Sequence, residues 1–412
     1  MGLKVDEDLS PALVERLTYL GTKLPSFRDA YEALEVLLRT KLSEKRVERQ
    51  TERIGDERVG QRQSEIAAWS HRTLMEKQAA PLGVKPPAVA AVLADGGRLQ
   101  LREANSEATS RWHEYKAGVL QSLASEVSVH DPCPEIPALY LQQDRIDQLA
   151  RQITQVAARQ EAEGPTTKAA ADAAIPVEEI QPHGYDPPKI VDRDVAATRT
   201  NSQAFGRQLA AQAWSLGLFG SPRKAFVGDG QNWIWTEWER HFQPFGFVPI
   251  LDFIHALTHV YAAALAGQNQ ATGWPVYQRW IAWIWQGRVV DVIAELAARQ
   301  QELGPPAPDD GETSPRTLVT KTLTYLQNQQ SRMKYPDYRR QGLPITSAHM
   351  ESTVKLINRR VKGSEKYWTD RGAEALLQLT SDLLSTSQPM THFWHTRPDR
   401  QTGYRTYPKH AA

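Results

Sequence analysis

The pattern of apolar and polar positions changes several times along the chain. Over residues 26–54, apolar residues recur at helical spacing behind two candidate N-caps, Ser26 and Ser43. This pattern predicts two helices joined by a short link, the second strongly basic and ending near Gly55. A helix-turn-helix that reads DNA has this form, and a helical hairpin with a charged outer face explains the pattern equally well.

A β-type pattern follows. The apolar run Ala88–Asp95 predicts a short strand that ends in a carboxylate and leads into a turn at Gly96-Gly97. The alternating segment Arg98–Glu103 predicts a second strand, and Trp112–Ala124 predicts a third. Three successive strands joined by short turns indicate an antiparallel meander.

Helices and strands alternate after this meander. Residues 140–163 read as a helix, and residues 164–200 read as a loop or an insertion with a weak helix. The pattern then predicts a helix at 201–216, a strand at 224–230, a helix at 232–242, a strand at 247–252, helices over 253–303, a linker at 304–315, and helices at 317–333, 347–360 and 370–386. From residue 388 the tail reads as irregular, aromatic and basic.

This order predicts an α/β protein with a mixed sheet of the ribonuclease H-like kind, interrupted by an all-helical insertion. The predicted segments are a helical N-terminal segment, the first part of the core with its own loop or insertion at about 125–200, the helical insertion, the return to the core, and the tail. They cover residues 1–80, 86–260, 261–340, 341–386 and 387–412.

Composition narrows the class of protein. The chain has 412 residues and one cysteine, Cys133, which excludes a disulfide scaffold and a Cys-rich zinc module. No apolar run reaches the roughly 18 residues of a membrane span, and the polar start is no signal peptide, so we expect a cytoplasmic protein. The net charge of +1 conceals an acidic middle, with 19 basic and 27 acidic residues over 81–315, and a basic end, with 16 and 7 over 316–412. A carboxylate-rich site beside a polyanion-binding surface has this distribution, as does ordinary solvated charge.

Three carboxylates are placed as a metal site requires. Asp95 and Asp229 each end a predicted strand and precede a glycine, and Glu351 falls in the first turn of a predicted helix. Three carboxylates meeting at one point repel one another, and two Mg²⁺ (or Mn²⁺) ions would neutralise them and leave positions open for phosphate and water. A single Asp-Gly is more often a plain turn, and it is the combination that favours a site.

Asp252, His255 and His259 share one helical face at i, i+3 and i+7. A zinc protease would carry Glu directly after the first histidine, and Ala256 there excludes that class. His255 either serves the site, at the scissile phosphate or against a carboxylate, or is a buried structural histidine.

At these residues the chain resembles the bacterial ISKra-type insertion-sequence transposases, which are relatives of the Mutator-like group with a DDE catalytic core. The matching strings, in the order of that family, are Val92–Glu103, Arg111–Lys116, Val227–Trp235, Ile250–His259, Gly342–Trp368 and the closing TGYRTY at Thr402–Tyr407. The resemblance spans roughly residues 86–407, and its specificity comes from the agreement of several independent strings.

The resemblance implies an RNase H-like fold with Asp95, Asp229 and Glu351 as catalytic residues and metal ligands. Asp252 and His255 match the [C/D]-x-x-H signature of Mutator-like enzymes. Asp95 has rivals in the neighbouring insertion, Asp192 and Asp194. The candidate DNA contacts are basic residues on the two helices concerned: Lys355, Arg359, Arg360 and Lys362, with Arg46, Arg49 and Arg53.

The sequence therefore predicts a DNA transposase that binds the terminal repeats of its element and catalyses metal-dependent cleavage and joining of double-stranded DNA. It would work as a homo-oligomer on DNA, with no membrane partner. The alternative is a catalytically inactive, transposon-derived DNA-binding protein. An RNase H-like nuclease of repair or RNA processing has no sequence feature in its favour. One of the tryptophans near Asp229 or in the insertion could stack on a flipped base. Core packing is the more frequent role of tryptophan.

Overall fold

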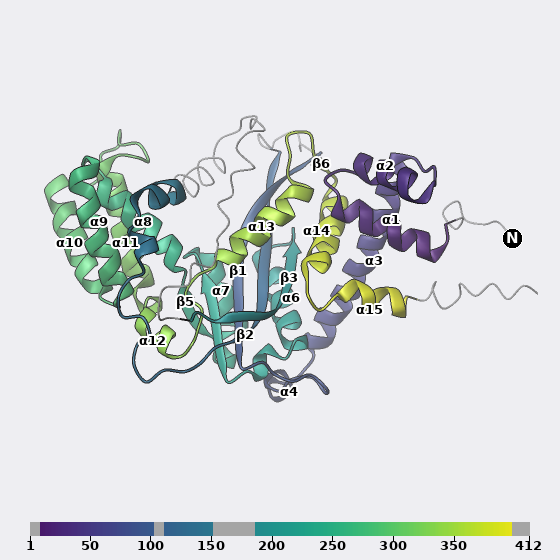
Figure 1. The fold of residues 1–412 in the computed structure, drawn as a ribbon, viewed down its shortest axis with the longest axis horizontal. Coiled ribbons are helices and arrows are strands. Elements are labelled where there is room, and N and C mark those ends of the chain that lie inside the picture. The colour runs from purple at the N-terminus through teal and green to yellow at the C-terminus, as the bar shows by residue number, and fades with distance from the viewer. Residues whose placement is uncertain (1–8, 103–110, 151–185, 398–412) are drawn as a thin grey trace, which may run out of the picture.

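A mixed β-sheet lies at the centre of the protein (Figure 1). The computed structural model describes residues 9–102, 111–150 and 186–397. The strand order is β3-β2-β1-β4-β5, and β6 pairs with β1 off this path. β2 is antiparallel to both of its neighbours, β1 and β3, whereas β4 and β6 run parallel to β1, and β5 runs parallel to β4. The bounds are β1 Val89–Leu101, β2 Trp112–Ala124, β3 Lys189–Thr198, β4 Arg223–Gly228, β5 Val248–Leu251 and β6 Tyr367–Trp368. The prediction of an α/β fold with a mixed sheet is confirmed.

β1 is one continuous strand, and the prediction of two strands separated by a turn at Gly96-Gly97 is wrong. Its ladder with β2 runs unbroken through this point, where Gly96 pairs with Lys116 and Gly97 with Tyr115. A Cβ on Gly97 would lie 2.3 Å from the Tyr115 hydroxyl, so this glycine admits a ring from the neighbouring strand. Asp95 therefore lies in mid-strand.

β3 lies where the sequence predicted a loop or weak helix over residues 164–200. Its first half is exposed, and only residues 194–198 are buried, so the strand lacks a regular apolar alternation. Asp194 is 4% exposed and accepts hydrogen bonds from the backbone and hydroxyl of Ser387. Of the predicted helix at 140–163, residues 143–150 are helical, and the rest lies outside the described residues.

Helices cover both faces of the sheet. On one face lie α13 (Ala348–Val361) and α14 (Asp370–Leu384), and the Tyr115 hydroxyl donates to Oδ1 of Asn358 there. On the other face lie α6 (Ser202–Ser215) and α7 (Asn232–His241). Gly118 faces α6, because a Cβ at this position would lie 2.6 Å from the Leu209 side chain. These helices agree with the predicted ones to within about two residues.

The segment predicted as an all-helical insertion folds into helices between β5 and α13, and it forms the end of the molecule drawn in green in Figure 1. Trp280 and Trp285 are each 2% exposed, as core packing requires. The helices are α8 Phe253–Leu265, α9 Gln270–Trp285, α10 Val289–Leu303, α11 Pro315–Gln329 and α12 Tyr335–Arg340. Short 3-10 turns occur at Ala138–Leu141, Leu218–Gly220, Gln243–Phe245 and Gln330–Arg332.

The N-terminal helices pack against the core at the opposite end (Figure 1). They are α1 Pro11–Lys23, α2 Phe27–Leu38, α3 Glu44–Ser70 and α4 Leu74–Gln78. The prediction that the basic helix ends near Gly55 is wrong, because α3 continues to Ser70. A Cβ on Gly55 would lie 2.6 Å from that of Ala375, so the glycine lets α3 approach α14 closely. One face of α3, the basic helix of the possible helix-turn-helix, is thus buried within the molecule.

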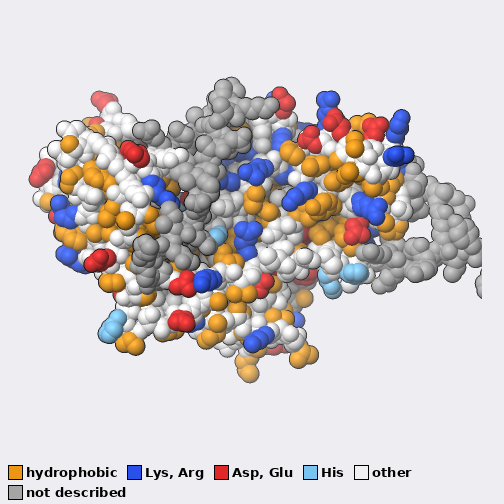
Figure 2. All heavy atoms as spheres, in the orientation of Figure 1, with side chains coloured by type: hydrophobic (Ala, Val, Ile, Leu, Met, Phe, Trp, Pro, Cys, Tyr) orange, Lys and Arg blue, Asp and Glu red, His pale blue; other side chains and the backbone are white. Residues whose placement is uncertain are grey.

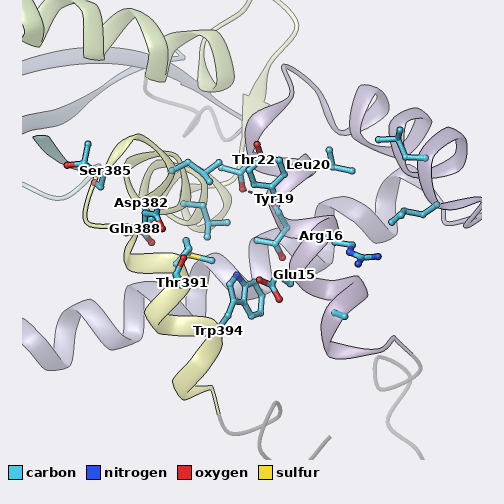
Figure 3. A pocket seen from close by; sticks show the side chains of 18 residues that line it. Glu15, Arg16, Tyr19, Leu20, Thr22, Asp382, Ser385, Gln388, Thr391 and Trp394 are labelled. Carbon is cyan, nitrogen blue, oxygen red and sulfur yellow. Dashed lines mark hydrogen bonds between the residues drawn. The ribbon is translucent and has the colours of Figure 1, made fainter. Parts of the chain in front are cut away.

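The tail is helical where it is described, since α15 covers Pro389–Thr396, and this part of the irregular-tail prediction is wrong. Thr402–Tyr407 lies outside the described residues. A cavity of about 940 Å³ lies among α1, α14 and α15, with Leu37 and Leu38 of α2 at its edge (Figure 3). It contains none of the predicted site residues. No helix of the described part is both long and apolar enough to span a bilayer.

Candidate functional site

Asp95 and Asp229 lie side by side on neighbouring parallel strands. Leu93 of β1 pairs with Val227 of β4, and each carboxylate follows two residues later. Because alternate residues of a strand share a face, both side chains lie on the face covered by α13, and adjacent strands are about 4.8 Å apart. Both residues are partly exposed.

Asp252 directly follows β5 and lies at the same level as Asp229, but its carboxylate is occupied by hydrogen bonds within the protein. Its backbone N–H donates to the Gly228 carbonyl at 2.8 Å, and its side chain is fully buried. Its carboxylate accepts from the backbone of Ile254 at 3.3 Å, which caps α8, and from the backbone and hydroxyl of Ser347, both at 2.9 Å. Nδ1 of His255 donates to it at 2.6 Å. Asp252 therefore fixes the starts of α8 and α13 together.

His255 is the cation of the group. Burial alone would lower its pKa, but the hydrogen bond to Asp252 and the negative charges of Asp252, Asp229 and Asp95 outweigh burial and raise the pKa to about 10. The ring is therefore an imidazolium at neutral pH. Its side chain is 22% exposed, so it can meet an anion from solvent.

Asp95 has a strongly raised pKa. Burial and the adjacent charge of Asp229 raise its pKa to about 7, with a further contribution from Glu351. The Gly96 N–H, which donates to Oδ1 at 2.6 Å, and the charge of His255 oppose the shift. The charge of His255 thus offsets only part of the effect of burial and of the neighbouring carboxylates.

Glu351 lies in the first turn of α13, the helix that crosses in front of β1 and β2 in Figure 1. Burial and the charge of Asp252 raise its pKa, whereas His255 and Lys355 oppose the shift. Its side chain is 28% exposed, and one oxygen lies 3.9 Å from Nζ of Lys355. The structure thus brings Glu351 within electrostatic range of Asp95.

The carboxylates fit magnesium or manganese in kind, since their donors are all oxygen. Within the described residues, no three Asp, Glu, His or Cys side chains are arranged to hold a metal ion. The candidate metal site therefore consists of the carboxylate pair Asp95 and Asp229, and Glu351 lies 3.9 Å from Nζ of Lys355.

Several residues that support the site were missed by sequence reasoning. Gln231 binds both oxygens of Asp229, with its N–H at 2.9 Å and its amide at 2.8 Å. Ser347 binds Asp252, and Tyr325 donates to the Asp229 carbonyl at 2.7 Å. An Asp followed two residues later by a polar residue is a signal for an Asx-type turn and could have indicated Gln231. No local pattern indicates Tyr325, which lies 96 residues away in sequence.

His259 stands apart from the other two residues of its run. Its ring stacks on Tyr325 with centroids 3.9 Å apart, and burial lowers its pKa to about 4. His259 is therefore neutral at physiological pH, unlike His255.

The basic residues after Glu351 divide into two groups. Lys355, Arg359 and Lys362 are exposed, and Figure 2 shows Lys and Arg side chains along the course of α13. Arg360, in contrast, is 3% exposed, donates to the Gly21 carbonyl at 2.8 and 3.0 Å, and lies over the Phe27 ring. Its position does not support the prediction that it contacts DNA, because it joins α13 to the N-terminal helices.

The predicted contacts on α3 differ in the same way. Arg49 is exposed and Arg46 is half-buried. Arg53 is half-buried, binds Gln50 at 2.8 and 3.0 Å, and pairs with Glu57 at 3.1 Å. Of the three predicted contacts on α3, Arg49 is the exposed one.

A comparison with known protein families finds no matching family model, and a search of curated proteins finds no match. The functional argument therefore depends on the residues and their geometry.

Proposed function

We propose that the protein is a DNA transposase with an RNase H-like core, which cleaves and joins DNA strands with the help of two divalent cations. The observation that carries the proposal is the pair Asp95 and Asp229, on adjacent parallel strands, beneath the helix that bears Glu351. The pKa of Asp95 is raised by its burial and by the charge of Asp229, and a bound cation would offset both effects.

The order of strands supports the RNase H-like part of the proposal. An antiparallel β3-β2-β1 unit continues into the parallel β4 and β5, and helices cover both faces. The first two acidic residues lie on β1 and directly after β4, and the helical insertion precedes the helix of the third. This is the arrangement that the resemblance to ISKra-type transposases implies.

Asp95, Asp229 and Glu351 would hold Mg²⁺ or Mn²⁺. The cations would supply activation of the attacking water or 3′-hydroxyl and stabilisation of the leaving oxygen. Glu351, which lies 3.9 Å from Nζ of Lys355, would be the third carboxylate of the set.

The other residues act on the DNA. Lys355, Arg359 and Lys362 lie exposed along and just beyond α13, where they would bind phosphates beside the carboxylates. The imidazolium of His255, held by Asp252 at 2.6 Å, would contact an oxygen of the scissile phosphate. Two DNA ends must be brought together for transposition, so the active form would be a dimer or larger assembly on DNA.

The test is Mg²⁺- or Mn²⁺-dependent cleavage of a duplex that carries the terminal repeat flanking the gene. Asp229→Ala and Glu351→Ala should abolish cleavage and leave binding of the duplex intact. Asp192→Ala is the control and also tests the rival of Asp95. Asp192 is exposed on β3, which β2 separates from β1, so the change should leave cleavage unchanged. Binding without cleavage by the wild type would favour the inactive DNA-binding descendant, and cleavage that survives Asp229→Ala would reject the assigned site.

A further inference from the structure

The turn that carries Asp229 is bound by a helix of the insertion. The Tyr325 hydroxyl of α11 donates to the Asp229 carbonyl at 2.7 Å, and the side-chain amide of Gln329 donates to the Gly230 carbonyl at 3.1 Å. Tyr325 and Gln329 are four residues apart, so both project from one face of α11. Two consecutive carbonyls after β4 are thus held by one helix face.

Gly230 permits this close approach. Its φ of +107° is a backbone conformation that favours glycine, and a Cβ there would lie 2.6 Å from the Tyr325 ring. The aromatic ring lies directly against the backbone of the turn. Any side chain at position 230 would push α11 away from Asp229.

The two donors are themselves fixed. The Tyr325 ring stacks on the His259 ring with centroids 3.9 Å apart. Gln329 is 4% exposed, and its Oε1 accepts from Nη1 of Arg332 at 3.0 Å, so its amide nitrogen is directed at Gly230. Arg332 lies over the Trp235 ring at 4.5 Å.

We propose that Tyr325 and Gln329 are positioning residues for Asp229, through which the helical insertion sets the direction of the Asp229 carboxylate. Gln231 contacts both Asp229 oxygens from the same turn, so the backbone that α11 holds also carries the group that orients the carboxylate. The insertion then contributes directly to the geometry of the site. The assignment rests on the proposed function only where it concerns metal binding and catalysis.

The experiment compares Tyr325→Phe with Tyr277→Phe in the full chain. Tyr277 is a matched control, because its hydroxyl also donates to a backbone carbonyl, that of Tyr140 at 2.9 Å, in the same insertion and away from Asp229. Hydrogen–deuterium exchange should rise about tenfold in the peptide over residues 227–233 for Tyr325→Phe, and not for Tyr277→Phe. Gln329→Met should have a similar effect by removing the second donor.

Calorimetric titration with Mn²⁺ alone supplies the second readout. Tyr325→Phe should weaken Mn²⁺ binding about tenfold, as loss of groups that orient a metal ligand does, and should lower kcat for cleavage with little change in KM. Unchanged exchange at 227–233, or equal changes in both tyrosine variants, would overturn the assignment. If wild type neither binds Mn²⁺ nor cleaves DNA, the proposed function fails, and the exchange experiment alone still decides the role of Tyr325.

Discussion

At the residue scale, Asp95 is a carboxylate whose ionisation the fold opposes. Its pKa is raised from 3.8 to about 7, so its contribution to stability is fully present below about pH 3.8 and is lost as the pH rises through about 7. Asp95→Asn should therefore increase the free energy of unfolding at pH 8 without divalent cations. For a partly exposed group we expect about 1–2 kcal/mol. Chemical denaturation at pH 8 and at pH 4 measures the difference, which should vanish at pH 4.

The same shift predicts a pH dependence of metal binding, because a protonated Asp95 cannot act as a ligand. Added Mn²⁺ should stabilise the wild type increasingly between pH 6 and pH 8, and Asp95→Asn much less. Asp192→Asn, a change on the exposed part of β3, controls for the loss of one negative charge. If Asp192→Asn reduced the stabilisation by Mn²⁺ as much as Asp95→Asn, net charge, and not the pair of Asp95 with Asp229, would explain the effect.

At the scale of elements, Asp252 joins the start of α8 to the start of α13 through Ser347. Ser347→Ala removes the hydroxyl bond to a buried carboxylate and should lower the free energy of unfolding by about 1–2 kcal/mol. Because α13 begins at this bond, Glu351 should lose its position, and Mn²⁺ affinity should fall. Ser352→Ala is the control, since that hydroxyl contacts only the Ala348 carbonyl of its own helix at 3.2 Å. Equal Mn²⁺ affinities in the two variants would reject the link.

The elements also indicate what a sequence can predict. Helix and strand patterns identified α6, α7, β4 and β5, because apolar residues recur at helical spacing in the two helices and form short continuous runs in the two strands. They failed at Gly97 and Gly55, where glycine allows Tyr115 and Ala375 to approach, which depends on partners distant in sequence. The burial of Arg360 also depends on distant partners. Its place among the basic residues of α13 predicted a DNA contact, yet the residue lies under the N-terminal helices.

At the scale of the whole molecule, the N-terminal helices and the core share buried ion pairs. Arg58 of α3 binds Asp382 of α14 at 2.9 and 3.3 Å, and these side chains are 6% and 5% exposed. Arg62 lies one turn further along and binds Glu374 at 2.6 Å. Glu374 also accepts from the Thr198 hydroxyl at 2.6 Å, so the pairs reach from α3 through α14 to β3. The helices expected to read DNA are thus part of the structure that supports the sheet.

This coupling predicts that the N-terminal helices and the core unfold in one transition. Arg58→Met leaves Asp382 buried without its cation and should cost about 3–5 kcal/mol, because an unpaired charge is then held away from water. Adding Asp382→Leu should recover most of that loss, since an apolar pair of similar volume replaces the ion pair. Arg53→Met, one turn earlier on the same helix, removes a half-exposed pair with Glu57 and should cost at most about 0.5 kcal/mol. Urea unfolding followed by circular dichroism measures all four proteins. Two separate transitions, or an Arg58→Met loss no larger than that of Arg53→Met, would mean that α3 is an independent module, free to present its buried face to DNA.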